Sequence, residues 1–309
     1  MSKNILRLIH YDQKILISRL YDVWATMEYL CLLDESESYV GAREPFFVSG
    51  GLLIPFDKVR PLHSFILSLV DQYDIPSGCP LKWNNPSGST VPPEALRKVK
   101  QQLLEGALTH SCRLFVSVVH KRIAETMKRK GEAHTYGLNS VLNAIDNTLC
   151  EEQASALFLI DRQPAKNTND SFNYLADKMS QGLRREAGQG SFPQGILGFG
   201  FVTSKSTRLA STLDFSLGAF TRCLDERSTT LRTDVGATVA RLLARRENGS
   251  VWERGLVVRP LKRIVFEDYA QAYVRALQRL ASCGLTELSN AKARRNSGWE
   301  AGWKVTITE

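Results

Sequence analysis

The 309-residue sequence lacks several features that would place it in common classes of protein. It has no run of about 20 apolar residues, the length that a membrane-spanning helix needs. Its N-terminal stretch mixes charged with apolar positions and does not resemble a secretion signal. None of the six cysteines stands in a Cys-x-x-Cys pair, which argues against a zinc site. We therefore expect a cytoplasmic protein with reduced thiols and no membrane partner.

The sequence also lacks the short motifs of several enzyme classes. It has no P-loop, and the glycines of GILGFGFVTSKS fall in a predicted strand and not in front of a helix, so they form no nucleotide-binding fingerprint. Ser36, Ser204 and Ser206 have no histidine spaced to complete a nucleophile motif. Nucleotide binding of these kinds and serine hydrolysis are therefore disfavoured.

Positive charge is present but unevenly distributed along the chain. The formal net charge is +8, and residues 205–309 hold 18 Lys and Arg against 11 Asp and Glu. Residues 1–204 are almost balanced, with 22 against 21. A clustered positive charge suits a polyanion such as nucleic acid. The same surplus also fits a solvated surface that only maintains solubility, so charge alone leaves both interpretations open.

Apolar strands alternate with amphipathic helices, a pattern that predicts an α/β domain with a central sheet flanked by helices. Strands are expected over 29–34, 46–54, 112–120, 156–161 and 196–204, and helices over 4–27, 58–73, 93–108, 134–152 and 209–224. Asp57 is placed to cap the second helix. Gly50 and Gly51 interrupt a strand and indicate a bulge or a close approach of another backbone. Residues 229–283 are expected to be mostly helical.

Two aspartates each follow four apolar residues, in LCLLDES and LFLIDRQ. Asp34 and Asp161 thus stand at the carboxyl ends of two predicted strands, where ligands gather in such sheets. If the two carboxylates converge, a divalent cation is the simplest way to neutralise them, and oxygen ligands favour Mg²⁺ or Mn²⁺. The same pattern also fits aspartates that cap helices or begin loops.

A third acid, Asp214, lies in the middle of the predicted helix LASTLDFSLGAFTRCL. Ala210, Gly218 and Thr221 lie on the same side of that helix as Asp214, which makes this side nearly smooth. A smooth side predicts a close approach to the sheet that brings the carboxylate to its rim. An exposed aspartate beside a packing face is the alternative.

Two more residues complete the candidate site. Lys82, in LKW, is placed to contact a phosphate or to orient a carboxylate, unless it is a surface lysine beside a packed Trp83. Glu35 either adds a ligand or faces water. Acids of this kind can hold two metal ions roughly 3.5–4 Å apart, which activate a water and stabilise the leaving oxygen of a phosphodiester.

The chain resembles the DUF thirty-eight-hundred family, a group of bacterial and phage-associated proteins. The motifs that carry the resemblance are DES at 34–36, LKW at 81–83, LIDR at 159–162 and LASTLDFSLGAFTR at 209–222. The resemblance covers roughly residues 29–227. It implies an RNase H-like fold, a mixed five-stranded sheet flanked by helices, with acids gathered for a divalent metal. Outside it, we expect an N-terminal helical extension over 1–28 and a helical, basic C-terminal extension over 228–309.

The functional positions that the resemblance implies are Asp34, Glu35, Ser36, Lys82, Asp161 and Asp214. Two departures stand out. The family often has an acid just before the middle lysine, whereas the sequence here is CPLKW, and the usual DESG is DESES here. If that acid is a ligand in relatives, the site here either binds metal differently or is inactive.

The leading hypothesis is a metal-dependent nuclease or phosphodiesterase that acts on RNA or DNA. Asp34, Asp161 and Asp214 would hold Mg²⁺ or Mn²⁺, with Glu35 as a fourth ligand and Lys82 near the substrate phosphate. The resemblance adds a role in antiphage defence or in a mobile element.

Two alternatives belong to other classes. One is an inactive nucleic-acid-binding module that uses the basic C-terminal region, with Trp299 and Trp303 stacking on bases. The other is a protein-interaction subunit or a homo-oligomer that docks through the N- and C-terminal extensions.

Overall fold

A computed structural model of the protein describes most of the chain. The described residues are 27–37, 46–76, 79, 81–84, 91–126, 132–161, 181–184, 190–202, 207–225, 235–296 and 301–307. The N-terminal extension expected over 1–28 lies outside these residues except for its last two positions. Trp299 lies outside them as well.

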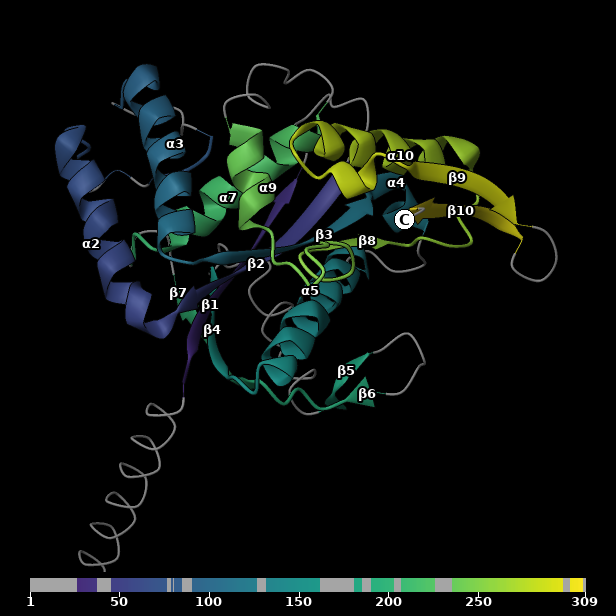
Figure 1. The fold of residues 1–309 in the computed structure, drawn as a ribbon, viewed down its shortest axis with the longest axis horizontal. Helices are drawn as coiled ribbons and strands as arrows, with labels where there is room; N and C mark the ends of the chain where they lie inside the picture. The colour runs from purple at the N-terminus through teal and green to yellow at the C-terminus, as the bar shows by residue number, and fades with distance from the viewer. Residues whose placement is uncertain are drawn as a thin grey trace, which may run out of the picture.

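The domain is built on a mixed six-stranded sheet in the order β7-β4-β1-β2-β3-β8 (Figure 1). Its strands are β1 (Tyr29–Glu37), β2 (Phe46–Pro55), β3 (Arg113–His120), β4 (Ala156–Asp161), β7 (Ile196–Val202) and β8 (Leu256–Arg259). β2 runs antiparallel to both β1 and β3. The pairs β1 with β4, β4 with β7 and β3 with β8 are parallel.

This topology confirms the expected fold class. The first five sheet strands along the chain are β1, β2, β3, β4 and β7. Across the sheet they lie in the order β3-β2-β1-β4-β7, and β2 alone among these five runs in the opposite direction. This order and direction are the RNase H-like arrangement. β8 adds a sixth strand beside β3. Because β8 follows residue 228, the sheet extends beyond the region that the sequence motifs cover. Because β2 alone runs in the opposite direction, the other five strands of this sheet end at the same edge. We call this edge the carboxyl edge.

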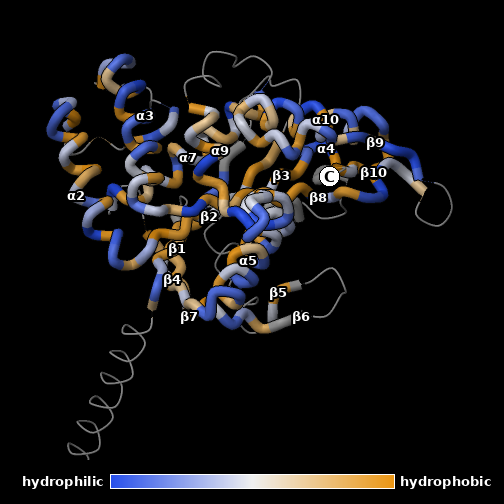
Figure 2. Tube along the Cα trace, viewed as in Figure 1, coloured by the Kyte–Doolittle hydropathy of each residue, from blue (hydrophilic) through white to orange (hydrophobic). Residues whose placement is uncertain are grey.

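Helices cover both faces of the sheet, and alternation along β1 shows which residues face each layer. Cys31 and Leu33 belong to a core with residues of α5 (Glu132–Glu151). Leu30 and Leu32 belong to the larger core with residues of α7 (Ala210–Leu224). That second layer also contains α2 (Phe56–Gln72), α3 (Pro93–Thr109) and α10 (Glu267–Ser282). Figure 2 shows the apolar strands enclosed between helices with hydrophilic outer sides. Among the described helices, none is long and apolar enough to span a bilayer.

Two glycines in β2 let both helical layers approach the sheet closely. A Cβ atom on Gly50 would lie 2.2 Å from Cδ2 of Leu217 in α7, and one on Gly51 would lie 2.6 Å from Cδ1 of Ile145 in α5. β2 pairs with β1 across this point without a register shift. The expected bulge is therefore wrong, and the close approach is made by side chains of the two helices and not by another backbone.

One predicted helix start is wrong. α2 begins at Phe56, directly after β2, and Pro55 occupies the N-cap position without a side-chain hydrogen bond. Asp57 lies inside the first turn and forms an ion pair with Lys58 at 2.7 Å. The strand leads into the helix without a loop, so no residue is left to act as a side-chain cap.

The C-terminal region contains helices, as expected, together with strands that periodicity did not predict. Its helices are α9 (Ala237–Leu242) and α10, and β8 enters the central sheet between them. An antiparallel hairpin of β9 (Ala291–Asn296) and β10 (Gly302–Ile307) then packs on α10. β8 has only four residues and is buried, which is too short to show a strand period.

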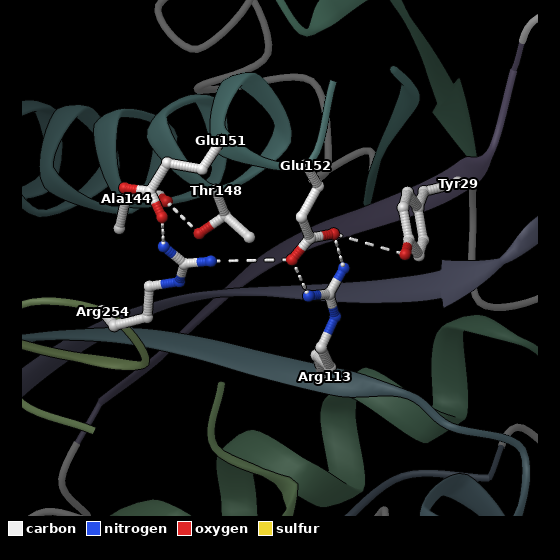
Figure 3. A network of polar contacts seen from close by, with 7 residues as sticks. All are labelled: Tyr29, Arg113, Ala144, Thr148, Glu151, Glu152 and Arg254. Carbon is white, nitrogen blue, oxygen red and sulfur yellow. Dashed lines mark hydrogen bonds and ion pairs between the residues drawn. The ribbon is translucent and has the colours of Figure 1, made fainter. Parts of the chain in front are cut away.

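A cluster of ion pairs and hydrogen bonds connects residues at the opposite edge of the sheet, where β1 and β3 begin (Figure 3). Arg113, the first residue of β3, donates two hydrogen bonds to the carboxylate of Glu152, one of them at 2.8 Å to Oε2. The Tyr29 hydroxyl donates to the same Oε2 at 3.4 Å. Arg254 forms ion pairs with Glu151 and Glu152. Burial opposes the charge on Arg113, but the hydrogen bonds and charge of Glu152 outweigh it and raise the pKa of the guanidinium.

Candidate functional site

The first two candidate residues lie at the carboxyl edge, on neighbouring strands. Leu33 of β1 pairs in parallel with Ile160 of β4, and the next residues along the two strands are Asp34 and Asp161. The backbone therefore places Asp34 and Asp161 side by side, about one strand spacing apart, or roughly 4.8 Å. The side chain of Asp161 lies outside what the structure describes. The adjacency rests on strand register alone.

Asp34 belongs to the row of the sheet that faces α7. Alternation puts position 34 in line with Leu30 and Leu32, which pack in the α7 core. Its cross-strand partner is Gly50, the glycine over which Leu217 of α7 packs. In β4, Leu159 packs against the same core, so position 161 continues that row. The two aspartate positions share one face of the sheet.

Glu35 lies in the other row. Its backbone N–H donates to Oδ1 of Asp34 at 2.8 Å, which fixes the orientation of that carboxylate. Its cross-strand partner is Ser49, a buried residue against which Gly137 of α5 packs. Alternation thus assigns Glu35 to the α5 face, opposite the row of Asp34. A role for Glu35 as a fourth ligand stays a prediction.

Asp214 and Lys82 meet in space. The carboxylate of Asp214 accepts a hydrogen bond from the backbone N–H of Trp83 through Oδ2. Its other oxygen, Oδ1, lies 3.5 Å from Nζ of Lys82, and the side chains of Lys82 and Asp214 are 29% and 21% exposed. Of the roles considered for Lys82, this geometry favours the orientation of a carboxylate.

The smooth side of α7 receives a tryptophan and not the sheet, which corrects the sequence prediction. A Cβ atom on Gly218 would lie 2.0 Å from Cγ of Trp83, so the indole rests directly on the glycine. Trp83 is only 6% exposed and contacts the ring of Phe215 edge-on. Leu217, one position earlier, is the residue that packs on the sheet. The missing side chain at Gly218 thus makes room for the segment that carries Lys82.

A second lysine, Lys100, lies near the carboxylate of Asp214. Nζ of Lys100, on α3, lies 4.3 Å from the centre of the Trp83 ring. Burial, followed by the nearby charge of Arg222, lowers the pKa of Lys100, and Asp214 partly offsets this change. Sequence reasoning did not find Lys100 or Arg222, because nothing in their local spacing relates them to an acid on a different element.

The residues at the carboxyl edge fit a hard divalent cation in their chemistry. Asp34 and Asp161 supply carboxylate oxygens, the ligands that Mg²⁺ and Mn²⁺ prefer, from adjacent strand ends. Within the described side chains, no group of three or more His, Cys, Asp or Glu residues is placed to hold a metal ion. The carboxylate of Asp161 lies outside these described side chains.

One tryptophan considered for base stacking, Trp303, is partly buried. Trp303 lies on β10 and packs against the core, on the side of the hairpin that faces α10. Its backbone bonds on both sides to Ile264, with N···O distances of 3.0 and 2.7 Å. The stacking role expected for Trp303 stays a prediction, because the ring is partly buried and packs on the domain with only part of its surface exposed.

Comparison with known proteins gives little likeness. No protein-family model matches the sequence, and no curated protein matches it. Among solved structures, a variant of Bst-RNase HIII is similar with a TM-score of 0.32 and 13% sequence identity. That similarity covers 70% of this chain and 63% of the ribonuclease, so the chain spans less than two thirds of its length. A likeness this distant assigns no activity.

Proposed function

We propose that this protein is a divalent-metal-dependent nuclease or phosphodiesterase that acts on RNA or DNA. One observation carries the proposal. Asp34 and Asp161 directly follow Leu33 and Ile160, which pair on neighbouring parallel strands of an RNase H-like sheet. Two like charges this close repel each other unless a cation or a proton neutralises them.

The chain would hold Mg²⁺ or Mn²⁺ between Asp34 and Asp161. When bound, the metal would supply an activated water and stabilise the leaving oxygen of a phosphodiester. The N–H of Glu35 holds one oxygen of Asp34 in place, so this carboxylate is oriented before any ligand binds. Such preorganisation lowers the cost of binding an ion.

Asp214 is proposed as the third acid, and Lys82 as the group near the substrate phosphate. The Lys82–Asp214 separation of 3.5 Å exceeds the ~2.7–2.9 Å of a strong charge-assisted hydrogen bond, so this pair can exchange partners at modest cost. A metal or a phosphate at the carboxyl edge would then compete for these two side chains. The backbone N–H of Trp83 keeps the aspartate anchored during this exchange.

Cleavage of labelled RNA and DNA oligonucleotides tests the proposal. The protein is incubated with Mg²⁺, with Mn²⁺ or with EDTA, and products are resolved by length. We expect cleavage only with metal, and a loss of at least ~100-fold for Asp34→Asn, the order found when one group that stabilises transition-state charge is removed. Asp57→Asn is the matched control, because Asp57 is an exposed aspartate on α2.

Two results would reject the proposal. One is cleavage by Asp34→Asn at the rate of the unmodified protein. The other is cleavage that continues in EDTA. A role in antiphage defence or in a mobile element is a further proposal that rests on the family resemblance, as does docking of protein partners through the terminal extensions.

A second candidate function is nucleic-acid binding without catalysis. The observation that favours it is that both oxygens of Asp214 contact protein donors, Lys82 and the N–H of Trp83. In this case, Asp214 would anchor the Lys82–Trp83 segment and hold no metal. Salt-sensitive binding that persists in EDTA, together with no cleavage under any metal condition, would favour this candidate over the first.

A further inference from the structure

The C-terminal hairpin is joined along β10 by the segment that follows β8, through an isolated bridge between Ile264 and Trp303. β9 and β10 pair so that Arg294 lies opposite Lys304. Along the other side of β10, the segment 261–264 forms further backbone hydrogen bonds, including one from the N–H of Val305 to the carbonyl of Leu261 at 2.9 Å. We call residues 261–264, 291–296 and 302–307 the basic ribbon.

The two faces of the basic ribbon differ in chemistry. Ala291 and Val305 are buried against the domain, and Trp303 and Ile307 pack beside them. Alternation therefore turns the other positions outward. The outward positions are Lys292, Arg294 and Asn296 on β9 and Lys304 and Thr306 on β10. Lys292 and Arg294 are exposed, and Figure 2 shows much of β9 in the hydrophilic colour.

In the part of the chain that the structure describes, the outward face carries positive charge that no acid pairs with. The three segments of the basic ribbon contain no Asp or Glu. Within the described ranges, no ion pair neutralises Lys292, Arg294 or Lys304. Lys262, on the third segment, is exposed as well. Clustered cations of this kind attract a polyanion and release its counterions on binding.

The basic ribbon begins at the edge of the sheet where the candidate acids lie. The segment 261–264 follows Arg259, the last residue of β8, and β8 ends at the same carboxyl edge as β1. From β1 to β8 there are three strand spacings, or roughly 14 Å. Through the strand register Asp34 is level with Leu256, so Arg259 lies three residues, or roughly 10 Å, further along the strand direction. The combined distance of roughly 17 Å corresponds to roughly five nucleotides at one phosphate per ~3.4 Å of helix axis on each strand.

We propose that the outward face of the basic ribbon binds the sugar–phosphate backbone of a double-stranded nucleic acid whose other part reaches the carboxyl edge. We infer a nucleic acid as the ligand from charge complementarity, and this inference rests on the proposed function. The outward positions of β9 and β10 have no aromatic side chain, and single-strand binding draws much of its energy from stacking on such rings. A duplex instead presents two rows of phosphates. Binding is therefore independent of base sequence and strongly dependent on salt.

Fluorescence anisotropy with a labelled duplex in EDTA tests this assignment on the full chain. The variant Lys292→Gln, Arg294→Gln, Lys304→Gln removes three charges from the outward face. The matched control Arg60→Gln, Lys98→Gln, Arg246→Gln removes three exposed charges elsewhere, two of them on α2 and α3 at the other end of the molecule (Figure 1). Because the two variants have the same net charge, a difference in their duplex binding reports contacts at the ribbon and not the overall charge of the protein.

The expected result is a shallower salt dependence for the ribbon variant only. Each phosphate contact contributes about 0.9 to the slope of log affinity against log salt, so losing three contacts lowers the slope by about 2.7. At 0.1 M salt we expect at least tenfold weaker duplex binding, with the control within about threefold of the unmodified protein. Equal slopes for the two variants would overturn the assignment. A larger loss for a single strand than for the duplex would overturn the choice of a duplex.

Failure of this inference and failure of the proposed function give different results. Binding in EDTA does not require cleavage, so a ribbon effect without metal-dependent cleavage would refute only the nuclease proposal. Conversely, metal-dependent cleavage together with a ribbon variant that binds like the control would refute only the ribbon. Thermal melting of both variants checks that the substitutions leave the fold intact.

Discussion

Gly218→Ala is the substitution that most directly tests how α7 positions the Lys82–Trp83 segment. The added Cβ would lie 2.0 Å from Cγ of Trp83 and 2.5 Å from both Cβ and Cδ1 of that residue, whereas ordinary contact begins near 3.4 Å. The indole must therefore move by about 1.4 Å. Since the contact includes the Cβ of Trp83, the backbone moves as well, and its N–H leaves the carboxylate of Asp214.

The magnitude follows from three contributions to the free energy of unfolding. Overpacking in a closely packed site costs about 1–3 kcal/mol. Loss of a hydrogen bond to a charged group costs about 1.5–3 kcal/mol. Alanine is favoured over glycine inside a helix by about 1 kcal/mol, which offsets part of the loss. The net destabilisation is about 1.5–5 kcal/mol.

Urea denaturation measures this change. We expect the midpoint to fall without a change in slope, as for a loss of stability alone. Gly198→Ala is the control, because a Cβ there meets Leu157 Cδ1 at an ordinary 3.8 Å. If Trp83 does not rest on Gly218, the substitution changes only the helix propensity of this position. Gly218→Ala would then be more stable than the unmodified protein. That result would refute the reasoning.

Two further predictions concern charged contacts. Burial alone would raise the pKa of Glu152, but Arg113 and Arg254 outweigh it and lower the pKa. Its carboxylate therefore stabilises the fold above the unfolded value near 4.5, and this contribution is lost as the pH falls through the lower folded value. Glu152→Gln should cost about 1–2 kcal/mol at pH 7, and this cost should shrink as the pH falls below the unfolded value. A cost in urea titrations that stays the same as the pH falls would contradict this. Lys82→Gln should lower the cleavage rate at least ~10-fold, while the free energy of unfolding changes by less than about 1 kcal/mol. Lys58→Gln is the control, because it removes only the exposed ion pair with Asp57, and it should leave the cleavage rate unchanged. Equal rates for these two lysine variants would remove Lys82 from the site.

The sequence was informative where a site residue directly follows a regular element. Asp34 and Asp161 end runs of apolar residues, and such runs predict buried parallel strands. Parallel neighbours end at the same edge, so their adjacency follows from the pattern once the strands pair. The order of the strands required the resemblance or the structure, because periodicity alone does not specify partners.

The contact between Lys82 and Asp214 could not be predicted in this way. The backbone N–H of Trp83 and the Asp214 carboxylate that accepts it are 131 positions apart, and their meeting depends on the indole resting on Gly218. The small residues beside Asp214 were a real signal, but the pattern does not say what fills the space they leave. Only the tertiary packing shows that it is a tryptophan and not the sheet.

The ends of elements and the last strands also escaped prediction. Asp57 has the composition of a cap, yet β2 runs into α2 and leaves no position for one. In β9, Lys292 and Arg294 alternate with Ala291 and Ala293, so the strand lacks the large apolar side chains that mark a buried one. The charge surplus of residues 205–309 was evident from composition, but its concentration on one face of a ribbon depends on the register of β9 and β10.

Anomalous diffraction from crystals soaked in Mn²⁺ would test the central claim most directly. The account predicts an ion at the carboxyl edge, about 2.0–2.3 Å from carboxylate oxygens of both Asp34 and Asp161. An ion bound elsewhere, or carboxylates of Asp34 and Asp161 that turn away from each other in the presence of Mn²⁺, would contradict it.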